Sequence, residues 1–180
     1  MIMEQNKKVV LLPLKEEDMP EFSQRMQEAF SAAVIETFGS LDDGPIPSDE
    51  DIQQSLKASG AEAYQIIYEE QQVGGAVVVI NPESQHNSLD FFFISPKQHS
   101  HGLGLAAWKA IEEKYPQTHV WETVTPYFEK RNINFYVNKC GFHIVEFFNE
   151  HHLDPHYMKD EDDSLPGEEA FFRFEKLMKK

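Results

Sequence analysis

The chain has 180 residues and a mass of 20.8 kDa, which suits one domain that buries a core without disulfides or a structural metal. Its 41% hydrophobic content excludes global disorder, and its formal net charge of −15 argues against a nucleic-acid partner, because it repels the phosphate backbone. Because Cys140 is the single cysteine and no apolar run reaches the length of a signal-peptide core or a membrane span, we expect a cytoplasmic protein without disulfides or a membrane partner.

The first part of the chain predicts a strand and two helices. The apolar run 9–14 predicts the strand. Apolar residues then recur at spacings of three and four between Met19 and Ala33, which indicates a helix with one buried face. After a loop rich in Gly, Pro and Asp, Ser48 with Asp51 resembles a capping box that opens a shorter helix. The acidic side chains of the whole chain, which cluster at 42–43, 49–51, 69–70, 160–163 and 168–169, have two interpretations: a solvated surface, or carboxylates that attract a cationic acceptor such as an amine.

The centre of the chain predicts a hairpin, a strand and a third helix. The apolar runs 63–68 and 73–80 predict the two strands of the hairpin. Gly74-Gly75 in the second run indicates a bulge or a close backbone approach. A further strand, 89–94, leads through a glycine-bearing turn into an amphipathic helix that ends before Pro116.

The last part of the chain predicts one more helix and three more strands. Thr125-Pro126 supplies an N-cap and a first-turn proline for the helix, and Gly141 a glycine C-cap. The strands are expected over 118–124, 142–148 and 170–174. A polar, histidine-bearing loop over 149–169 is longer than the usual connection. The element order predicts a single α/β (α+β) domain over 1–180, with a mixed sheet covered by helices.

A strand, a glycine-bearing loop and a helix start follow one another within residues 88–115. Unpaired backbone N–H groups and the helix dipole then point at one place, which predicts an anion site at 99–105. The chain lacks the third glycine of a dinucleotide-binding fingerprint after Gly104, so this motif is absent. The glycine spacing of a P-loop occurs at Gly39 and Gly44, but Pro45 follows where a P-loop has Lys, so this motif is absent too. An ordinary glycine turn before a helix is the alternative interpretation.

Two segments resemble motifs of the GNAT superfamily of N-acetyltransferases. Ile94-Ser95-Pro96 followed by the loop 99–104 is similar to its acetyl-CoA-binding motif, V-x-P and then [RQ]-x-x-G-x-[GA], with His99 where the family usually has Arg or Gln. Residues 132–142 are similar to its late F-Y-x-x-x-G-F segment. The family often carries an Asn seven residues before the Tyr of that segment. This chain has Glu129 there, and Asn132 is the nearest carboxamide.

The resemblance covers about residues 9–148, leaving a C-terminal loop and last strand over 149–180, and implies a mixed, mostly antiparallel sheet flanked by helices. It further implies transfer of an acetyl group from acetyl-CoA to a primary amine of a small molecule or peptide, by direct attack in a ternary complex. A homodimer is an open alternative to a monomer. The residues that would bind the co-substrate are Phe92, Phe93, Ile94, His99, Ser100, His101, Gly102, Leu103, Gly104, Leu105 and Asn132.

Acetyl transfer needs two proton transfers: the acceptor ammonium must lose a proton, and the departing thiolate must gain one. The resemblance and the residue types indicate three side chains for these transfers. Tyr136 occupies the position from which many relatives protonate the departing thiolate; a core Tyr with a bonded hydroxyl is the alternative. Asp90 and Glu122 are the candidate bases, with a water chain as the remaining option. Because strand residues alternate, we expect Asp90 on one face with Phe92 and Ile94, where its pKa would rise.

Two further interpretations remain open at this point. His152 and His156 have the spacing of a helical zinc pair, but Pro155 would break that helix and no Glu follows as in H-E-x-x-H, so we expect no metal. The same fold could instead form a catalytically inactive module that binds acyl-CoA or a partner protein. An inactive module would need neither Tyr136 nor an acidic side chain in its strands.

Overall fold

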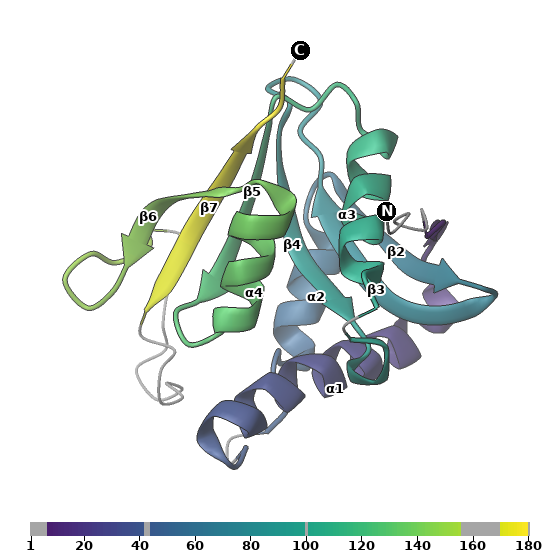
Figure 1. The fold of residues 1–180 in the computed structure, drawn as a ribbon, viewed down its shortest axis with the longest axis horizontal. Coiled ribbons are helices and arrows are strands. Elements are labelled where there is room, and N and C mark those ends of the chain that lie inside the picture. Colours follow the sequence, from purple (N-terminus) through teal and green to yellow (C-terminus); the bar gives the residue numbers. More distant parts are fainter. Residues whose placement is uncertain (1–6, 42–43, 100, 156–169, 180) are drawn as a thin grey trace, which may run out of the picture.

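One seven-stranded sheet organises the computed structural model, which describes residues 7–41, 44–99, 101–155 and 170–179 (Figure 1). The strands are β1 (Val10–Pro13), β2 (Ala61–Tyr68), β3 (Gln71–Val79), β4 (His86–Ile94), β5 (Val120–Pro126), β6 (His143–Phe148) and β7 (Phe171–Leu177). Their order is β1-β2-β3-β4-β5-β7-β6, and only the β4–β5 pair is parallel. The expected mixed, mostly antiparallel sheet in a single domain is confirmed.

Helices cover both faces of the sheet (Figure 1). They are α1 (Met19–Phe38), α2 (Asp49–Lys57), α3 (Leu103–Lys114) and α4 (Lys130–Asn134), which continues as the π-helical segment η3 (Phe135–Cys140); η1 (Glu16–Asp18) and η2 (Pro96–Gln98) are short 3-10 turns. The helices α1 and α2 lie on the far face, and α3 and α4 on the near face. Among the described helices, none combines the length and hydropathy needed to cross a membrane.

The two faces carry separate parts of the core. On the α1 side, Phe22 and Met26 are fully buried against Val77 and Phe93, as the spacing of apolar residues in α1 predicts. On the α3 side the largest group of buried residues includes Trp108 and Trp121, whose rings meet edge to face at 5.4 Å. Other members of that group are Leu89, Ile111, Phe142 and Phe174.

The predicted hairpin is present, with a tighter turn than expected. Glu69 and Glu70 form a two-residue connection, and both have positive φ, 48° and 65°, as hairpin turns that match strand twist require. The close approach expected at the glycine pair is confirmed at Gly74, where an added Cβ would lie 2.1 Å from the Phe93 carbonyl oxygen. A register shift beside it, between Ile66 and Ile67, is also the expected bulge.

The start of the last helix differs from the expectation. Pro126 ends β5, where it pairs with Phe171 of β7, and α4 begins only at Lys130. The predicted N-cap at Thr125 is therefore wrong, because pairing with a distant strand extends β5 through this dipeptide. The glycine C-cap is confirmed: Gly141 has φ 83°, and its N–H donates to the Tyr136 carbonyl oxygen. Since β7 lies between β5 and β6, the core extends to the last strand of the chain.

A β-bulge in β4 decides which way its side chains point. Val77 pairs with Phe91 and Val78 with Leu89, so Asp90 is the extra residue of the bulge. The expectation that Asp90 shares a face with Phe92 is therefore wrong. The Phe92 side chain packs on the α3 side of the sheet, whereas the Asp90 carboxylate accepts a hydrogen bond from Ser55 of α2.

The parallel strands β4 and β5 separate towards their carboxyl ends. Their ladder runs only from the His86–Val120 pair to the Ser88–Glu122 pair. Beyond it, the Thr123 hydroxyl donates to the Leu89 carbonyl oxygen at 2.9 Å. The strands therefore diverge over the last residues of β4, and this opening positions the candidate site.

Candidate active site

A cavity of about 250 Å³ lies between α1, the diverging ends of β4 and β5, and the α4–η3 segment. Its apolar lining residues are Phe30, Val34, Phe38, Ile46, Pro47, Phe91, Phe92, Val124, Pro126, Phe128 and Phe171. Its polar lining residues are Asp51, Asp90, Thr123, Thr125, Glu129, Asn132 and Tyr136. The cavity thus combines a largely aromatic wall with a few polar groups, which is the usual make-up of a small-molecule site.

Glu129 is the buried carboxylate of this cavity. It follows the turn after β5, and its carbonyl oxygen accepts from the Ile133 N–H at 3.0 Å, which starts α4. Only 8% of the residue is exposed, and its carboxylate accepts a hydrogen bond from the Asn132 amide. Burial raises the pKa of Glu129 to about 7, against the smaller lowering effect of that hydrogen bond. The group can therefore take up and release a proton near neutral pH.

Tyr136 lies in the same cavity and is 5% exposed. Its ring packs against the rings of Phe135, Phe142 and Phe174 at centroid distances of 5.4–5.8 Å. Burial, with the nearby Cys140 and Glu129 adding to it, raises the pKa of the Tyr136 hydroxyl well above its ordinary value. The hydroxyl therefore stays protonated at neutral pH and is available as a proton donor.

The two base candidates nominated from the sequence lie in different places. Asp90 is exposed at the cavity edge, and its carboxylate accepts from Ser55 at 3.0 Å and from Ser88 at 2.8 Å. Glu122 does not line the cavity. Its carboxylate lies 3.0 Å from His86 and 3.2 Å from Arg173. The structure therefore brings Asp90, but not Glu122, to the cavity.

Glu122 belongs to a group of charged side chains on the sheet, which we call the Arg173 network. Its members are Arg173, Glu122, Glu146 and Glu175, with His86 and His152 at its ends. Arg173 pairs with all three carboxylates at 2.5–3.2 Å. Hydrogen bonds from His152 and then from Arg173 lower the pKa of Glu146. The network therefore holds its three carboxylates in ion pairs with one guanidinium.

Sequence reasoning missed Glu129 as a candidate base. The available signal was the substitution itself, a carboxylate where the family often has an Asn. Asn132, expected to bind the co-substrate, lines the cavity and donates to Glu129. The carboxylate at position 129 is thus bonded to the carboxamide of Asn132.

The glycine loop leads into the first turn of α3 as expected. Gly102 adopts the left-handed conformation, φ 73°, and Leu103 is the first helical residue. The N–H groups of residues 103–105 precede the first intrahelical donor, Ala106, which bonds to the Gly102 carbonyl. They form the positive end of a 12-residue helix, which can accept an anion. Ser100, also expected in this site, lies outside the described residues.

His99 is turned towards its own strand. Its Nε2 lies 2.8 Å from the Ile94 carbonyl oxygen, and burial is the main cause that lowers its pKa. A carbonyl only accepts, so Nε2 carries the proton and the neutral ring offers only an acceptor at Nδ1. His99 therefore ties the loop to the end of β4 rather than supplying a positive charge.

The aromatic residues around the loop have distinct roles. The Phe92 ring stacks on Phe135 of η3 at 5.8 Å, beside the cavity, whereas Phe93 is buried on the other face against Phe22. An added Cβ on Gly104 would lie 3.3 Å from the Phe135 ring. The glycine at 104 therefore allows α3 to pack closely on Phe135.

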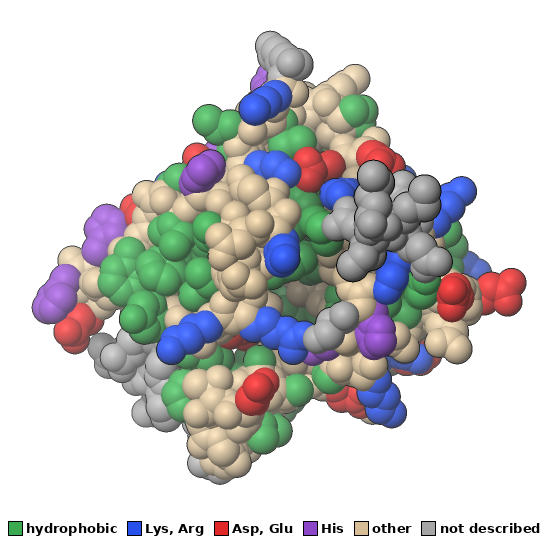
Figure 2. Space-filling model, in the orientation of Figure 1, with side chains coloured by type: hydrophobic (Ala, Val, Ile, Leu, Met, Phe, Trp, Pro, Cys, Tyr) green, Lys and Arg blue, Asp and Glu red, His purple; other side chains and the backbone are tan. Residues whose placement is uncertain are grey.

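Positive side chains surround this part of the surface although the chain is acidic overall, with a net charge of −15. Figure 2 shows Lys and Arg side chains around a hollow between the positions of α3 and α4. Arg131 of α4 is close enough to His99 to contribute to the lowering of the His99 pKa. The face that carries the helix N-terminus is therefore suited to a polyanion.

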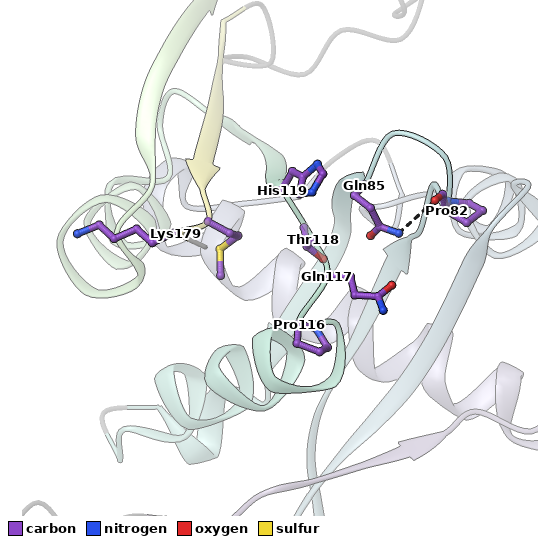
Figure 3. A pocket seen from close by; sticks show the side chains of 8 residues that line it. Pro82, Gln85, Pro116, Gln117, Thr118, His119 and Lys179 are labelled. Carbon is purple, nitrogen blue, oxygen red and sulfur yellow. Dashed lines mark hydrogen bonds between the residues drawn. The ribbon is translucent and has the colours of Figure 1, made fainter.

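A second hollow, of about 460 Å³, lies elsewhere in the molecule (Figure 3). It is lined by Pro82, Gln85, Pro116, Gln117, Thr118, His119, Met178 and Lys179. Most of these residues are exposed, and Gln85 bonds to Pro82 within the rim. The residues that line this hollow include no carboxylate and none of the site residues expected from the sequence. The smaller cavity is therefore the candidate site.

Of the two histidines with the spacing of a helical zinc pair, only His152 lies within the described residues. His152 stacks on Phe148 at 5.5 Å and its Nε2 lies 2.7 Å from Glu146. His156 lies outside the described residues. His152 is thus part of the Arg173 network.

Comparisons with known proteins find similar sequences. The sequence profile of the acetyltransferase (GNAT) family matches residues 20–142. Uncharacterized protein YrkN of Bacillus subtilis (strain 168) is 61% identical over 176 residues, covering 96% of this chain and 95% of that protein.

Solved structures share the fold. The spermidine N-acetyltransferase of Vibrio cholerae, in complex with CoA and spermine, has a TM-score of 0.67 at 12% identity, with 94% of this chain and 95% of that chain covered. The ribosomal-protein-S18-alanine N-acetyltransferase of Escherichia coli has a TM-score of 0.66 at 14% identity, with 93% and 92% covered. At such identities the likeness concerns the fold alone.

Proposed function

Because the chain belongs to the acetyltransferase (GNAT) family, we propose that it transfers an acetyl group from acetyl-CoA to a primary amine of a small molecule or peptide. The observation that carries the proposal is one cavity that holds a buried carboxylate titrating near neutral pH and a buried tyrosine that stays protonated. Acetyl transfer to an ammonium needs one group of each kind.

Glu129 takes the first proton. The ammonium of the acceptor gives a proton to the carboxylate, and the neutral amine nitrogen then forms a bond to the thioester carbonyl carbon. Asp90, at the cavity edge, is the alternative proton acceptor. Glu122 is the less supported choice, because its carboxylate is engaged by Arg173.

Tyr136 gives the second proton. As the carbon–sulfur bond breaks, the hydroxyl protonates the thiolate, and the second proton lost by the nitrogen restores the hydroxyl. The proton held by Glu129 passes to solvent, so the products are the acetamide, CoA thiol and one proton. Backbone groups at the end of β4, Phe92–Ile94, polarise the thioester carbonyl.

The co-substrate fits the opening between β4 and β5. The N–H groups at the start of α3, residues 103–105, would hold the pyrophosphate together with the loop residues His101 and Gly102. Asn132 would assist by fixing Glu129 rather than by contacting the co-substrate. We also propose a cytoplasmic location; a homodimer stays a prediction.

The experiment that tests this function measures thiol release from acetyl-CoA with a panel of amines. We expect turnover in the wild type and a fall in kcat of about 100-fold in Tyr136→Phe, which keeps the ring but removes the proton donor. CoA affinity, measured by calorimetry, should stay within about twofold, since the ring packing is retained.

Two results would contradict the proposal. Undiminished turnover in Tyr136→Phe would remove Tyr136 from the mechanism. CoA binding without turnover of any amine would favour the inactive acyl-CoA-binding module, which would be detected as a rise in Tm with CoA alone.

A further inference from the structure

We infer that the acceptor is a primary monoamine whose body is a single compact apolar group, aromatic or branched, rather than a polyamine, an amino acid or a sugar amine. The inference rests on the proposed acetyl transfer and names the class of amine that the cavity selects. Three properties of the described cavity carry it: its wall, its charge and its size.

The wall is built from ring faces that belong to three elements. Phe30 of α1 meets Phe91 of β4 edge to face at 6.1 Å, and Phe38 of α1 meets Phe128 of the β5–α4 turn at 5.0 Å. Val34 lies between the two phenylalanines of α1 along the helix and is 6% exposed. This wall offers no hydrogen bond to hydroxyl groups or to a second ammonium, and it favours an apolar body.

The charge of the lining is of one sign. The ionisable lining residues are Asp51, Asp90, Glu129 and Tyr136; no Lys, Arg or His is among the described residues that line the cavity. An acceptor carboxylate or phosphate would therefore lie beside carboxylates without a cationic partner. The lining accepts an ammonium and opposes any anionic substituent.

The carboxylates lie at two depths. Asp51 and Asp90 are exposed, whereas Glu129 is 8% exposed. The Asp90 carboxylate already accepts from Ser55 and Ser88, so it is partly satisfied without a ligand. A single ammonium reaching Glu129 is thus compensated inside the cavity, whereas a further ammonium group of a polyamine could be compensated only at the exposed Asp51 or Asp90.

The volume limits the body of the acceptor. The cavity measures about 250 Å³, below the range of roughly 300–1,000 Å³ typical of sites for drug-sized ligands. The same cavity includes Tyr136 and Phe92, where the reacting thioester must also lie. The space left beside the thioester therefore suits one ring or one branched alkyl group better than the several rings of an aminoglycoside.

The test compares kcat/KM for matched amines at a fixed acetyl-CoA concentration. The panel contains 2-phenylethylamine, 3-methylbutylamine, phenylalanine, spermidine, a peptide with an N-terminal alanine, and methylamine. We expect 2-phenylethylamine to exceed phenylalanine, which differs from it by one carboxylate, by about 100-fold or more. We expect it to exceed spermidine by about tenfold or more.

A pair of variants locates the selectivity in the wall. Val34→Phe adds volume inside the cavity and should lower the ratio of kcat/KM for 2-phenylethylamine over methylamine by about tenfold. Ile35→Phe makes the same kind of change one residue later, where the side chain is 47% exposed and does not line the cavity, and should leave the ratio unchanged.

The outcomes separate this inference from the proposed function. If spermidine, phenylalanine or the peptide is the best acceptor, the inferred class is wrong while acetyl transfer stands. If no amine releases thiol, the proposed function fails and the inferred class fails with it. If 2-phenylethylamine is preferred but Val34→Phe leaves the ratio unchanged, the cavity is not the acceptor site.

Discussion

Glu122 and Glu129 are close in the chain but lie in opposite environments. Glu122 is 30% exposed, belongs to the Arg173 network and is bonded to a guanidinium. Glu129 is 8% exposed, its carboxylate accepts a hydrogen bond from the Asn132 amide, and its pKa is raised to about 7. The same side chain is therefore held in an ion pair in one region and buried with a raised pKa in the other.

The difference shows which environment suits a carboxylate to the proposed proton transfer. An ion pair holds a carboxylate in one protonation state, as hydrogen bonds from His152 and Arg173 do for Glu146 by lowering its pKa. Burial without a cation destabilises the charged form and brings the pKa into the working range. Burial of the cavity carboxylate thus lowers the stability of the fold at neutral pH but suits the proposed proton transfer, whereas the network carboxylates stabilise the sheet.

The largest expected effect is on turnover. Glu129→Gln removes the proton acceptor but keeps the shape of the side chain, so we expect kcat/KM to fall about 100-fold at pH 8. In the wild type, kcat/KM should rise with pH through about 7 as Glu129 ionises, and the variant should lack this rise. The measurement is a pH profile of thiol release for both proteins.

Glu122→Gln is the matched control for that variant. It makes the same substitution in the Arg173 network, and kcat/KM should stay within about threefold with the pH profile retained. The opposite pattern, with Glu122→Gln the more damaging change, would reverse the assignment of the base.

The next effect concerns the stability of the fold. The pKa of Glu129 is higher in the folded state, about 7, than in the unfolded chain, so its contribution is fully present at low pH and is lost as the pH rises through about 7. The free energy of unfolding of the wild type should therefore fall by about 2 kcal/mol more than that of Glu129→Gln between pH 5 and pH 8. Urea unfolding at both pH values measures this difference. Parallel changes in the two proteins would mean that Glu129 is solvated.

The smallest effect belongs to the Arg173 network. Arg173→Met leaves three carboxylates without their cation, and the free energy of unfolding should fall by about 1–2 kcal/mol at pH 7, less than for a fully buried pair because solvent screens the network. The pKa of Glu146 is lowered in the folded state. The difference in the free energy of unfolding between Arg173→Met and the wild type should therefore shrink as the pH falls below the pKa of an ordinary carboxyl group. Added salt should also reduce it. A stability loss that is independent of both pH and salt would assign Arg173 a packing role instead.

Local sequence patterns predicted much of the fold. The spacing of apolar residues located α1, the Ser48 cap located the start of α2, and Gly141 located the end of the η3 segment. The strand, glycine loop and helix start were also predicted, since each depends on residues within one short segment. Tyr136 was assigned to the site from its motif, and the structure places it in the cavity.

Predictions that depended on distant segments failed. The face of Asp90 was wrong because a bulge opposite β3 shifts the alternation, and the helix start at Thr125 was wrong because β7 pairs with β5 as far as Pro126. Glu129 was not assigned as a base, since it is buried in a cavity that distant residues of α1 and β4 line together with its sequence neighbours.

By itself, the sequence determined the family, the order of elements and the loop that opens α3, because helix periodicity, caps and glycine turns are local properties of the chain. Only the tertiary structure decided which carboxylate is buried with a raised pKa. The pKa of a carboxylate depends on its solvation and on the charges around it, and both are set by segments that meet only in the folded molecule. The same reason applies to the inferred class of acceptor, which rests on a wall assembled from α1, β4 and the β5–α4 turn.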